Sequence, residues 1–513
     1  MGRRIRWLGI VLILCFGLVI VQLTNIQFHR AAALATSKDN PINTVPPYTI
    51  DDRGSIFAAD GETLAYSQRI APKGSDTYQF QRVYPMGSLF SQIVGTCSPV
   101  YCNTGVEGYY SSQLGLHKQS AQTLSQLLSP PPPTTDDITL TIDPALQELA
   151  TQELAGLPGP NRDGAIVMLN PKTGAILAFA SNPSYDPDPL VSSDFKTEEA
   201  AEVLDTLKDS EGFAPIDPIA SYNTIAPGST AKVVTTAAIY NLDPSLATYN
   251  FPTTACLKNI PDTNQEICND ADTASAADAC GGTIVQMLPA SCDPGYAELG
   301  LLLGATDLSE QAALFGFDAT PPLDLPSGYV QPSQYPTAQD MSADCSPSSP
   351  QCVGIPGQAY SAFGQQDVET TALQNALVAA GIANGGAVMT PHFLEKITNA
   401  QGQVVETYQP KVWKQAMTPQ AAEQVVPLMQ SVATSGTARG DGFPASLDVA
   451  VKTGTAQVGF PTITSVSDWM IGFAPANNPE VAIAVAVPYQ PLTTQGASVA
   501  GPVVRTMLEK ALG

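Results

Sequence analysis

The sequence predicts an α+β protein, in which an antiparallel sheet covered by helices follows a small β-rich module and one transmembrane helix. Strand-like segments occur in pairs at both ends of the long C-terminal region, and helical segments lie between them. Strands that enclose a set of helices in chain order favour one sheet with the helices packed on it. The transmembrane helix is predicted from an uncharged apolar run that follows a cluster of arginines near the N-terminus.

Composition restricts the possible functions. The 513 residues include 23 Lys and Arg against 47 Asp and Glu, which gives a formal net charge of −24. Such a chain has no basic surface for a nucleic-acid backbone, so we expect no nucleic-acid partner. Three histidines and no CxxC pair leave little room for a metal site or a Ser/His/Asp relay, and we expect no metal and no cofactor. Any chemistry must therefore use other bases.

The N-terminal segment is expected to be a membrane anchor. Arg3, Arg4 and Arg6 precede Trp7–Leu23, a run of uncharged residues that would span about 25 Å as a helix. The arginines predict that residues 1–6 stay in the cytoplasm and that the C-terminal part is extracytoplasmic. A cleaved signal peptide is the alternative, because Ala31–Ala33 offers small residues, but polar Gln22–Arg30 separates them from the apolar run.

Eight cysteines follow the predicted anchor, and an even number in an oxidising space predicts disulfides. Cys97 with Cys102, and Cys345 with Cys352, are close enough in sequence to pair locally. The other four fall at intervals of twelve residues, and the sequence leaves their connectivity open. They are Cys256, Cys268, Cys280 and Cys292.

A proline run divides the extracytoplasmic part. Residues 129–137 cannot hold a helix and are expected to form a semi-rigid linker. Upstream, residues 31–128 contain short strand-like pieces and a hairpin turn at Ala59–Gly61, which predicts a β-rich module. Downstream, residues 138–513 form the main domain. Its expected strands are 164–169, 175–180, 449–452, 469–474 and 481–487, and its expected helices include 370–383 and 503–512.

The segment Ala226–Val234 is the most informative for chemistry. Pro227 and Gly228 form a turn, and Ser229 opens a helix on which Lys232 is the i+3 neighbour, about 5 to 6 Å away at Cβ. A serine hydroxyl needs a base to remove its proton, whereas a free lysine, with a pKa of ~10.4, is protonated at neutral pH. Burial and a second positive group are therefore required to make Lys232 a base.

Lys452-Thr-Gly-Thr455 is the second informative segment. It ends an apolar strand-like run, for which a plain strand end and turn is the alternative interpretation. Two similar motifs are weaker candidates. Ser193–Lys196 also fits SxxK but lies among acidic residues, which favours a solvated face. Lys172–Gly174 is a KTG in a hairpin turn.

With these segments in place, the chain resembles the class B penicillin-binding proteins, monofunctional transpeptidases that cross-link peptidoglycan and use SxxK, SxN and KTG motifs. The resemblance extends over nearly the whole chain. It rests further on segments at 53–56, 60–65, 105–108, 140–147, 364–366, 383–386 and 469–475. It implies a penicillin-binding, β-lactamase-like domain, in which the helix-covered sheet holds the three motifs.

The resemblance also implies a role for each residue. Ser229 would be the acylated nucleophile and Lys232 its general base, while Ser291 would relay a proton to the leaving amine. Lys452 would hold Lys232 neutral. In the segment Thr453, Gly454, Thr455, the two hydroxyls would bind the substrate carboxylate, and the N–H groups of Ser229 and Thr455 would form the oxyanion hole.

One position departs from the family pattern, because no SxN lies between Ser229 and Lys452. The nearest candidates are Ser291-Cys-Asp293 and Ser342-Ala-Asp344, and we favour the first because Leu288–Asp293 resembles the family segment. Ionised Asp293 accepts hydrogen bonds but lacks the amide donor of Asn. A carboxylate between two lysines also favours their charged forms, which opposes base catalysis.

The function implied is a D,D-transpeptidase that cross-links stem peptides through a Ser229 acyl-enzyme and is a target of β-lactams. The alternatives are a catalytically weak or silent scaffold of wall synthesis, which Asp293 would favour, and a D,D-carboxypeptidase or β-lactamase. The resemblance further implies a membrane glycan polymerase as partner. The sequence does not distinguish elongation, division and sporulation, and it does not identify the acceptor amine.

Overall fold

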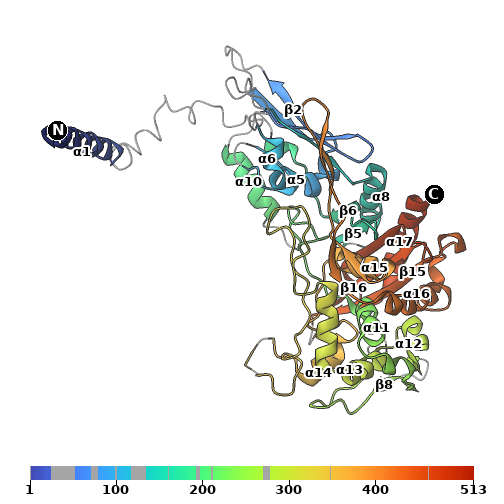
Figure 1. Cartoon of the computed structure of the whole chain (residues 1–513). Coiled ribbons are helices and arrows are strands. Elements are labelled where there is room, and N and C mark those ends of the chain that lie inside the picture. Colours follow the sequence, from blue (N-terminus) through green and yellow to red (C-terminus); the bar gives the residue numbers. More distant parts are fainter. Residues whose placement is uncertain are drawn as a thin grey trace.

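The computed structural model describes residues 2–24, 52–70, 79–98, 101–116, 134–159, 161–191, 197–208, 212–269, 278–346, 348–349, 351–459 and 462–513. Figure 1 shows the first strands at one end of the folded part and the helices around α11 to α14 at the other. The arrangement is that of an α+β protein with two principal sheets.

The main sheet has five antiparallel strands in the order β15-β16-β17-β5-β6. Its strands are β5 (Gly164–Leu169), β6 (Ile176–Asn182), β15 (Ala450–Val458), β16 (Ser465–Ala474) and β17 (Val481–Gln490). Each predicted strand of this domain is therefore confirmed, although the last three extend several residues further than the apolar runs alone indicated. β15, which carries Lys452, is an edge strand.

Helices pack on this sheet, as expected. α8 (Pro144–Ala155) and α17 (Gly496–Leu512) contact each other and the sheet, and α15 (Ala372–Ala383) packs across β16, β17 and β5. α17 begins seven residues before the predicted helix, since its first turn, Gly496–Ser498, contains small residues that carried no apolar signal. Val503, Val504, Met507 and Leu508 of α17 are fully or almost fully buried.

α9 (Asp188–Val191) and α10 (Thr197–Lys208) lie beside the N-terminal module, where α9 contacts the strand Gln79–Val83 (Figure 1). The other helices form the lobe around α11 (Lys232–Asn241) and next to β15. Besides α11 they are η3 (Gly228–Ala231), η4 (Pro244–Thr248), α12 (Ile284–Ala290), α13 (Asp293–Phe315), α14 (Gly354–Ser361), α16 (Pro419–Thr434), η6 (Arg439–Asp441) and η7 (Ala445–Leu447). Three two-stranded ribbons complete it. They pair β7 (Phe251–Thr254) with β10 (Cys280–Gly282), β8 (Cys256–Leu257) with β9 (Ile267–Cys268), and β11 (Ala387–Met389) with β14 (Val412–Gln415).

The second sheet joins segments that are far apart in the sequence. Its six strands have the order β13-β12-β4-β1-β2-β3, and they are β1 (Ile56–Phe57), β2 (Thr63–Ile70), β3 (Gln79–Val83), β4 (Asp137–Leu140), β12 (Leu394–Thr398) and β13 (Val404–Thr407). β1 and β2 form the expected hairpin around Ala59–Gly61. The pairing of β4 with β12 was not predicted, because nothing local in the sequence specifies a partner more than 250 residues away.

The N-terminal module is less uniformly β than expected. Besides β1, β2 and β3, it contains η2 (Gly87–Leu89), α4 (Ser91–Val94), α5 (Gly105–Tyr109) and α6 (Ser111–Leu114). Buried Glu107 of α5 is paired with Arg53 and Arg82, both of which come from the strand side of the module. The short helices were missed because a single turn shows no helical periodicity.

Four disulfides are formed. Cys97–Cys102 and Cys345–Cys352 are the two pairs that the spacing predicted. The four cysteines at intervals of twelve pair in sequence order, Cys256 with Cys268 and Cys280 with Cys292. The structure therefore resolves the connectivity that the sequence left open.

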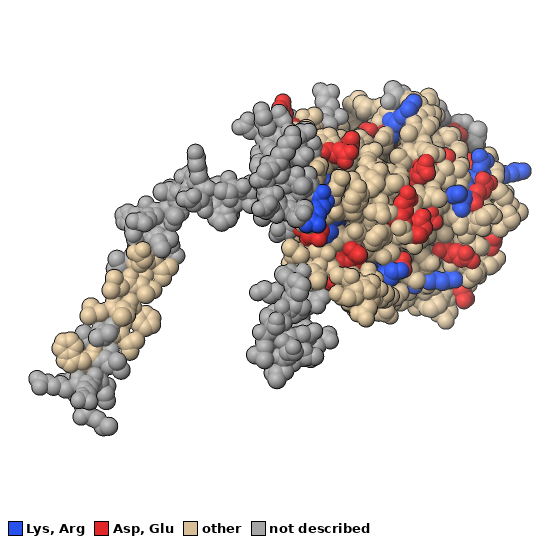
Figure 2. Space-filling view, turned by 90° about the horizontal axis from the view of Figure 1, so that it is seen from above, with Lys and Arg blue, Asp and Glu red and all other residues tan. Residues whose placement is uncertain are grey.

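The predicted anchor lies in α1 (Gly2–Thr24), many of whose side chains are outside the described residues. Within the part of the chain whose placement is described, no helix is long and apolar enough to cross a membrane. Residues 129–133 of the predicted linker are also outside the described residues. On the face seen in Figure 2, basic side chains are scattered among acidic ones and form no continuous basic patch.

Candidate active site

Ser229 lies in a short 3-10 turn that leads into α11. Gly228, with φ of +53°, approaches β15 so closely that a Cβ atom there would lie 2.6 Å from the carbonyl oxygen of Thr455. Only glycine combines this backbone conformation with so close an approach. The turn is held further by the indole of Trp469, which donates to the carbonyl of Ala226 at 2.9 Å. Ser229 is thereby fixed beside the edge strand of the main sheet.

Lys232 is fully buried, and its amine meets three residues of the site. Its Nζ lies 2.9 Å from the hydroxyl of Ser229 and 3.1 Å from that of Ser291, and it donates to the carbonyl of Ser291 at 2.6 Å. It also pairs with the carboxylate of Asp293. These are four contacts, one more than the three protons of an ammonium can serve. A neutral amine has a lone pair, to which the hydroxyl of Ser229 or that of Ser291 can donate a hydrogen bond.

Ser291 and Asp293 occupy the junction between α12 and α13. Ser291 has left-handed dihedral angles, φ of 55° and ψ of 43°, which turn its carbonyl and its hydroxyl toward Lys232. A non-glycine residue in this conformation costs free energy and persists only where the surroundings enforce it. Asp293 begins α13, and its backbone N–H donates to the side chain of Asn269 at 3.0 Å.

Lys452 reaches the same serine from the sheet. Its Nζ donates to the hydroxyl of Ser291 at 2.9 Å and to the carbonyl of Thr453 at 2.8 Å. Burial lowers the pKa of Lys452 well below its usual range, and the nearby charge of Lys232 lowers it further, while Asp293 opposes the shift. The hydroxyl of Ser291 thus lies between two buried amines that cannot easily both be charged.

Three threonines, Thr437, Thr453 and Thr455, line the cavity that contains Ser229. Thr453 and Thr437 share a hydrogen bond of 2.6 Å, and Thr455 accepts from the N–H of Gly496 at 3.0 Å, at the start of α17. The hydroxyl of Thr455 also lies 3.3 Å from the carboxylate of Asp468, which is fully buried on β16. Burial raises the pKa of Asp468 to about 6.

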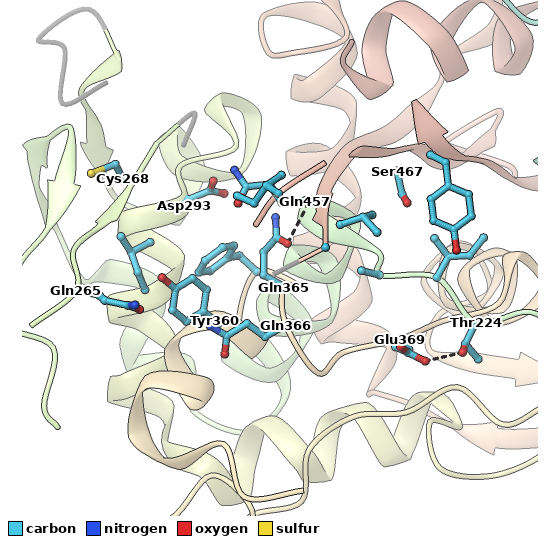
Figure 3. A pocket seen from close by; sticks show the side chains of 18 of the residues that line it. Thr224, Gln265, Cys268, Asp293, Tyr360, Gln365, Gln366, Glu369, Gln457 and Ser467 are labelled. Carbon is cyan, nitrogen blue, oxygen red and sulfur yellow. Dashed lines mark hydrogen bonds between the residues drawn. The ribbon is translucent and has the colours of Figure 1, made fainter. Parts of the chain in front are cut away.

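Several of these side chains line a cavity of about 440 Å³. Ser229, Ser291 and Asp293 line it together with Thr437, Thr453 and Thr455. A second cavity of about 550 Å³ adjoins it, since Asp293, Gln365, Gln457 and Ile463 line both. Figure 3 shows the second cavity, with the side chain of Gln365 hydrogen bonded to the backbone of Gln457.

The structure brings the predicted residues together. Ser229, Lys232, Ser291, Asp293 and Lys452 form one hydrogen-bonded cluster, and Thr453, Gly454 and Thr455 lie beside it on β15. Gly454 is needed there, because a Cβ atom would lie 2.7 Å from the carbonyl oxygen of Pro227.

The weaker candidates lie elsewhere or outside the description. Ser342 bonds to its own loop at Gln339, and Asp344 is exposed. Lys172 lies in the turn between β5 and β6, and its amine bonds to the side chain of Asn478. Ser193–Lys196 is outside the described residues.

Sequence reasoning missed Thr437, Asn269 and Asp468. Each belongs to a loop or strand whose local sequence carries no motif, and each is recognisable only by what the fold places next to it.

Comparison with known proteins agrees with this geometry. Residues 164–509 match the family model described as the penicillin binding protein transpeptidase domain, and residues 53–135 match the penicillin binding protein A dimerisation domain.

Among curated proteins, the chain is 31% identical to the peptidoglycan D,D-transpeptidase PbpA of Mycolicibacterium smegmatis, over all of this chain and 99% of that protein. It is 28% identical to stage V sporulation protein D of Bacillus subtilis, over 84% of this chain and 64% of that protein.

Solved structures similar to this chain are also penicillin-binding proteins and transpeptidase domains. Penicillin-binding protein A of M. tuberculosis, solved as a penicillin G acyl-enzyme complex, has a TM-score of 0.75 at 29% identity. The match covers 90% of this chain and all of that one. The D,D-transpeptidase domain of a peptidoglycan glycosyltransferase from Eggerthella lenta has a TM-score of 0.71 at 27% identity, with coverage of 90% and 99%.

Proposed function

The chain belongs to the penicillin-binding protein transpeptidase family, and on that premise we propose that it is a serine D,D-transpeptidase that cross-links peptidoglycan stem peptides. The observation that carries the proposal is the hydroxyl of Ser291 between two buried amines, one of which, Lys232, lies 2.9 Å from the hydroxyl of Ser229. This arrangement supplies a nucleophile, a base and a path for the proton.

Acylation begins when Ser229 transfers its proton to Lys232. For that step Lys232 must be neutral, whereas its contact with Asp293 favours the ammonium form. The hydroxyl of Ser291 connects Lys232 to Lys452, so a proton can pass between the two amines. The depressed pKa of Lys452 favours its neutral form and therefore opposes this transfer, as does the pairing of Lys232 with Asp293. The reactive arrangement is a neutral Lys232 and a charged Lys452, which the free enzyme must reach against this preference.

Ser229 Oγ then attacks the carbonyl carbon between the two terminal D-alanines of a stem peptide. We expect the N–H groups of Ser229 and Thr455 to stabilise the oxyanion, and the hydroxyls of Thr453 and Thr455 to bind the C-terminal carboxylate. The C–N bond breaks as the proton on Lys232 passes through Ser291 to the leaving amine, and D-alanine departs. An amine of a neighbouring stem then attacks the ester, loses a proton and releases Ser229.

β-Lactams would acylate the same serine, because their strained amide occupies the position of the D-Ala-D-Ala bond. We expect labelling of Ser229 by a fluorescent penicillin, located by mass spectrometry of the modified peptide. Loss of the adduct in Ser229→Ala, with retention in Ser342→Ala, supports the enzyme. A wild-type chain that stays unlabelled while correctly folded would favour the silent scaffold.

A hydrolytic enzyme, such as a carboxypeptidase or β-lactamase, is the second candidate. It needs a carboxylate that activates a water for deacylation. Among the described residues that line the cavity of Ser229, Asp293 is the only carboxylate, and it is paired with Lys232. Among these described lining residues there is no second carboxylate that could activate a water, which favours transfer to an amine.

We also propose the location inferred from the sequence. Residues 1–6 would lie in the cytoplasm, Trp7–Leu23 would anchor the chain in the bacterial cytoplasmic membrane, and the rest would be extracytoplasmic, where disulfides are stable. The module of residues 31–128, the linker 129–137 and the domain 138–513 would form the ectodomain. A membrane glycan polymerase of the wall-synthesis machinery would be the partner, and it would contact the anchor and the N-terminal module.

A further inference from the structure

The cavity next to the reaction centre has a lining that differs from that of the Ser229 cavity. It has a volume of about 550 Å³, within the range of small-ligand sites in proteins. It meets the Ser229 cavity at Asp293, Gln365 and Gln457, and it extends from there along the end of β15 at Val458. A peptide whose reacting bond lies at Ser229 could therefore place a neighbouring side chain in it.

Among the described residues, the charged side chains that line this second cavity are all acidic. Its lining contains the carboxylates of Glu266, Asp293 and Glu369, and none of the described residues that line it is Lys, Arg or His. Asp293 is paired with Lys232, and Glu266 lies 3.2 Å from Lys258 at the exposed rim. Among the described residues, no cation lies within ion-pair distance of Glu369.

Glu369 is held firmly in place. Its backbone N–H and carbonyl both bond to the backbone of Gln334, and its carboxylate accepts a hydrogen bond of 2.5 Å from the hydroxyl of Thr224 (Figure 3). Burial, and then the negative charge of Glu369, raise the pKa of the adjacent Asp367. The carboxylate of Glu369 is thus fixed in position, partly buried and close to a second acid, which is a favourable place for a cation.

A buried hydroxyl independently indicates a polar ligand. Ser467 of β16 is fully buried and lines the cavity, where its side chain is seen in Figure 3. Its Oγ has no hydrogen-bond partner among the described residues. Because a buried polar atom without a partner costs free energy, a ligand that bonds to Ser467 would recover that cost.

One wall of the cavity is aromatic. The rings of Tyr360 and Phe363 have centroids 5.5 Å apart, and both line the space. Such a wall accommodates the aliphatic part of a long side chain and attracts a cation to the ring faces. Carboxylate, hydroxyl and aromatic groups together suit an alkylammonium better than an anion or a purely apolar group.

We propose that this cavity binds the ammonium side chain of a diamino acid in the donor stem peptide, with Glu369 as its counter-ion. The inference rests on the proposed transpeptidase function and extends it to substrate class. The donor is favoured over the acceptor because a carboxylate keeps an amine protonated, whereas the attacking amine needs its lone pair. A side chain that carries a free carboxylate would be disfavoured, since no described residue of the lining offers a cation.

The test compares three peptides, Nα-acetyl-X-D-Ala-D-Ala with X as lysine, norleucine or glutamate. Each is added to the full chain, and the readout is how strongly it slows acylation of Ser229 by a fluorescent penicillin, which requires binding but no turnover. We expect the lysine peptide to act at a concentration about tenfold lower than norleucine, and the glutamate peptide to be the weakest.

Variants assign the effect to Glu369. The ratio to be measured is the norleucine-peptide concentration divided by the lysine-peptide concentration that slows acylation equally. Glu369→Gln should bring this ratio close to one, whereas Glu369→Asp should keep most of the wild-type ratio. Glu480→Gln, in an exposed surface loop, should leave the ratio unchanged. A ratio near one in the wild type, or a ratio that survives Glu369→Gln, would overturn the proposal. Absence of penicillin labelling in the wild type would overturn the proposed function as well, so the two failures are distinguishable.

A last comparison separates donor from acceptor. An acyl-enzyme is formed first from a norleucine thioester donor and then captured by the lysine peptide. If Glu369→Gln slows only this capture and leaves the ratio of the first assay intact, the ammonium belongs to the acceptor, and our assignment to the donor is wrong.

Discussion

The carboxylate of Asp293 accepts a hydrogen bond from the amine of Lys232, the same amine that lies 2.9 Å from the hydroxyl of Ser229. The family motif has Asn at this position by resemblance, and an Asn side chain would form no ion pair with the lysine. It stabilises the charged form of the residue that should act as base.

Asp293→Asn should therefore speed acylation. Removing the negative charge favours the neutral amine of Lys232, so the acid limb of the pH profile for penicillin acylation should move to lower pH. Near neutral pH we expect a rate increase of about three- to tenfold. Stopped-flow measurement with a fluorescent penicillin from pH 5 to 9 would test this, and a slower variant would show that Asp293 assists the reaction.

Ser291→Ala should break the proton path. Without the hydroxyl between them, Lys232 and Lys452 lose their common partner, and acylation should slow by about 100-fold or more. Ser342→Ala, in the other SxD sequence, is the matched control and should retain the wild-type rate. Equal rates for the two variants would exclude Ser291 from proton transfer.

Asp468→Asn should change how stability depends on pH. The pKa of Asp468 is raised to about 6 in the folded chain, so its contribution is fully present below the unfolded pKa near ~4 and is lost as pH rises through 6. Above pH 7 the buried carboxylate costs about 2 to 3 kcal/mol.

The melting temperature of Asp468→Asn relative to the wild type should thus be higher at pH 7.5 than at pH 5. Thermal denaturation at the two pH values measures this difference, and exposed Asp344→Asn should show none. A difference of the opposite sign would mean that Asp468 is stabilised in its ionised form.

Glu107→Ala should destabilise the N-terminal module. Its buried carboxylate pairs with Arg53 at 2.9 Å and with buried Arg82, and removal leaves two guanidinium groups without their anion. We expect a loss of about 3 to 5 kcal/mol in the free energy of unfolding. Exposed Glu62→Ala, in the same module, is the control.

Chemical denaturation would measure the loss, and penicillin labelling per folded molecule would locate it. Because Glu107 packs beside the second sheet and not beside Ser229, the labelled fraction of folded protein should not fall. A selective loss of labelling would instead show that the module controls the active site.

The sequence by itself determined the strands of the main sheet, the helical segment that follows Ser229, and the two motifs that supply Ser229, Lys232 and Lys452. These features are local: strands and helices have their own periodicity, and SxxK needs only a helical turn to bring its two groups together. The choice of Ser291 and Asp293 over Ser342 and Asp344 came from the resemblance of Leu288–Asp293 to the family segment.

Only the tertiary structure decided which side chains face one another across long stretches of chain. It placed Ser291 between two amines, brought Thr437 to Thr453 and Asp468 to Thr455, paired β4 with β12, and set Glu369 at the end of a second cavity. Such contacts depend on how the helices and loops pack on the sheets, and a packing contact leaves no period or spacing in the sequence from which it could be read.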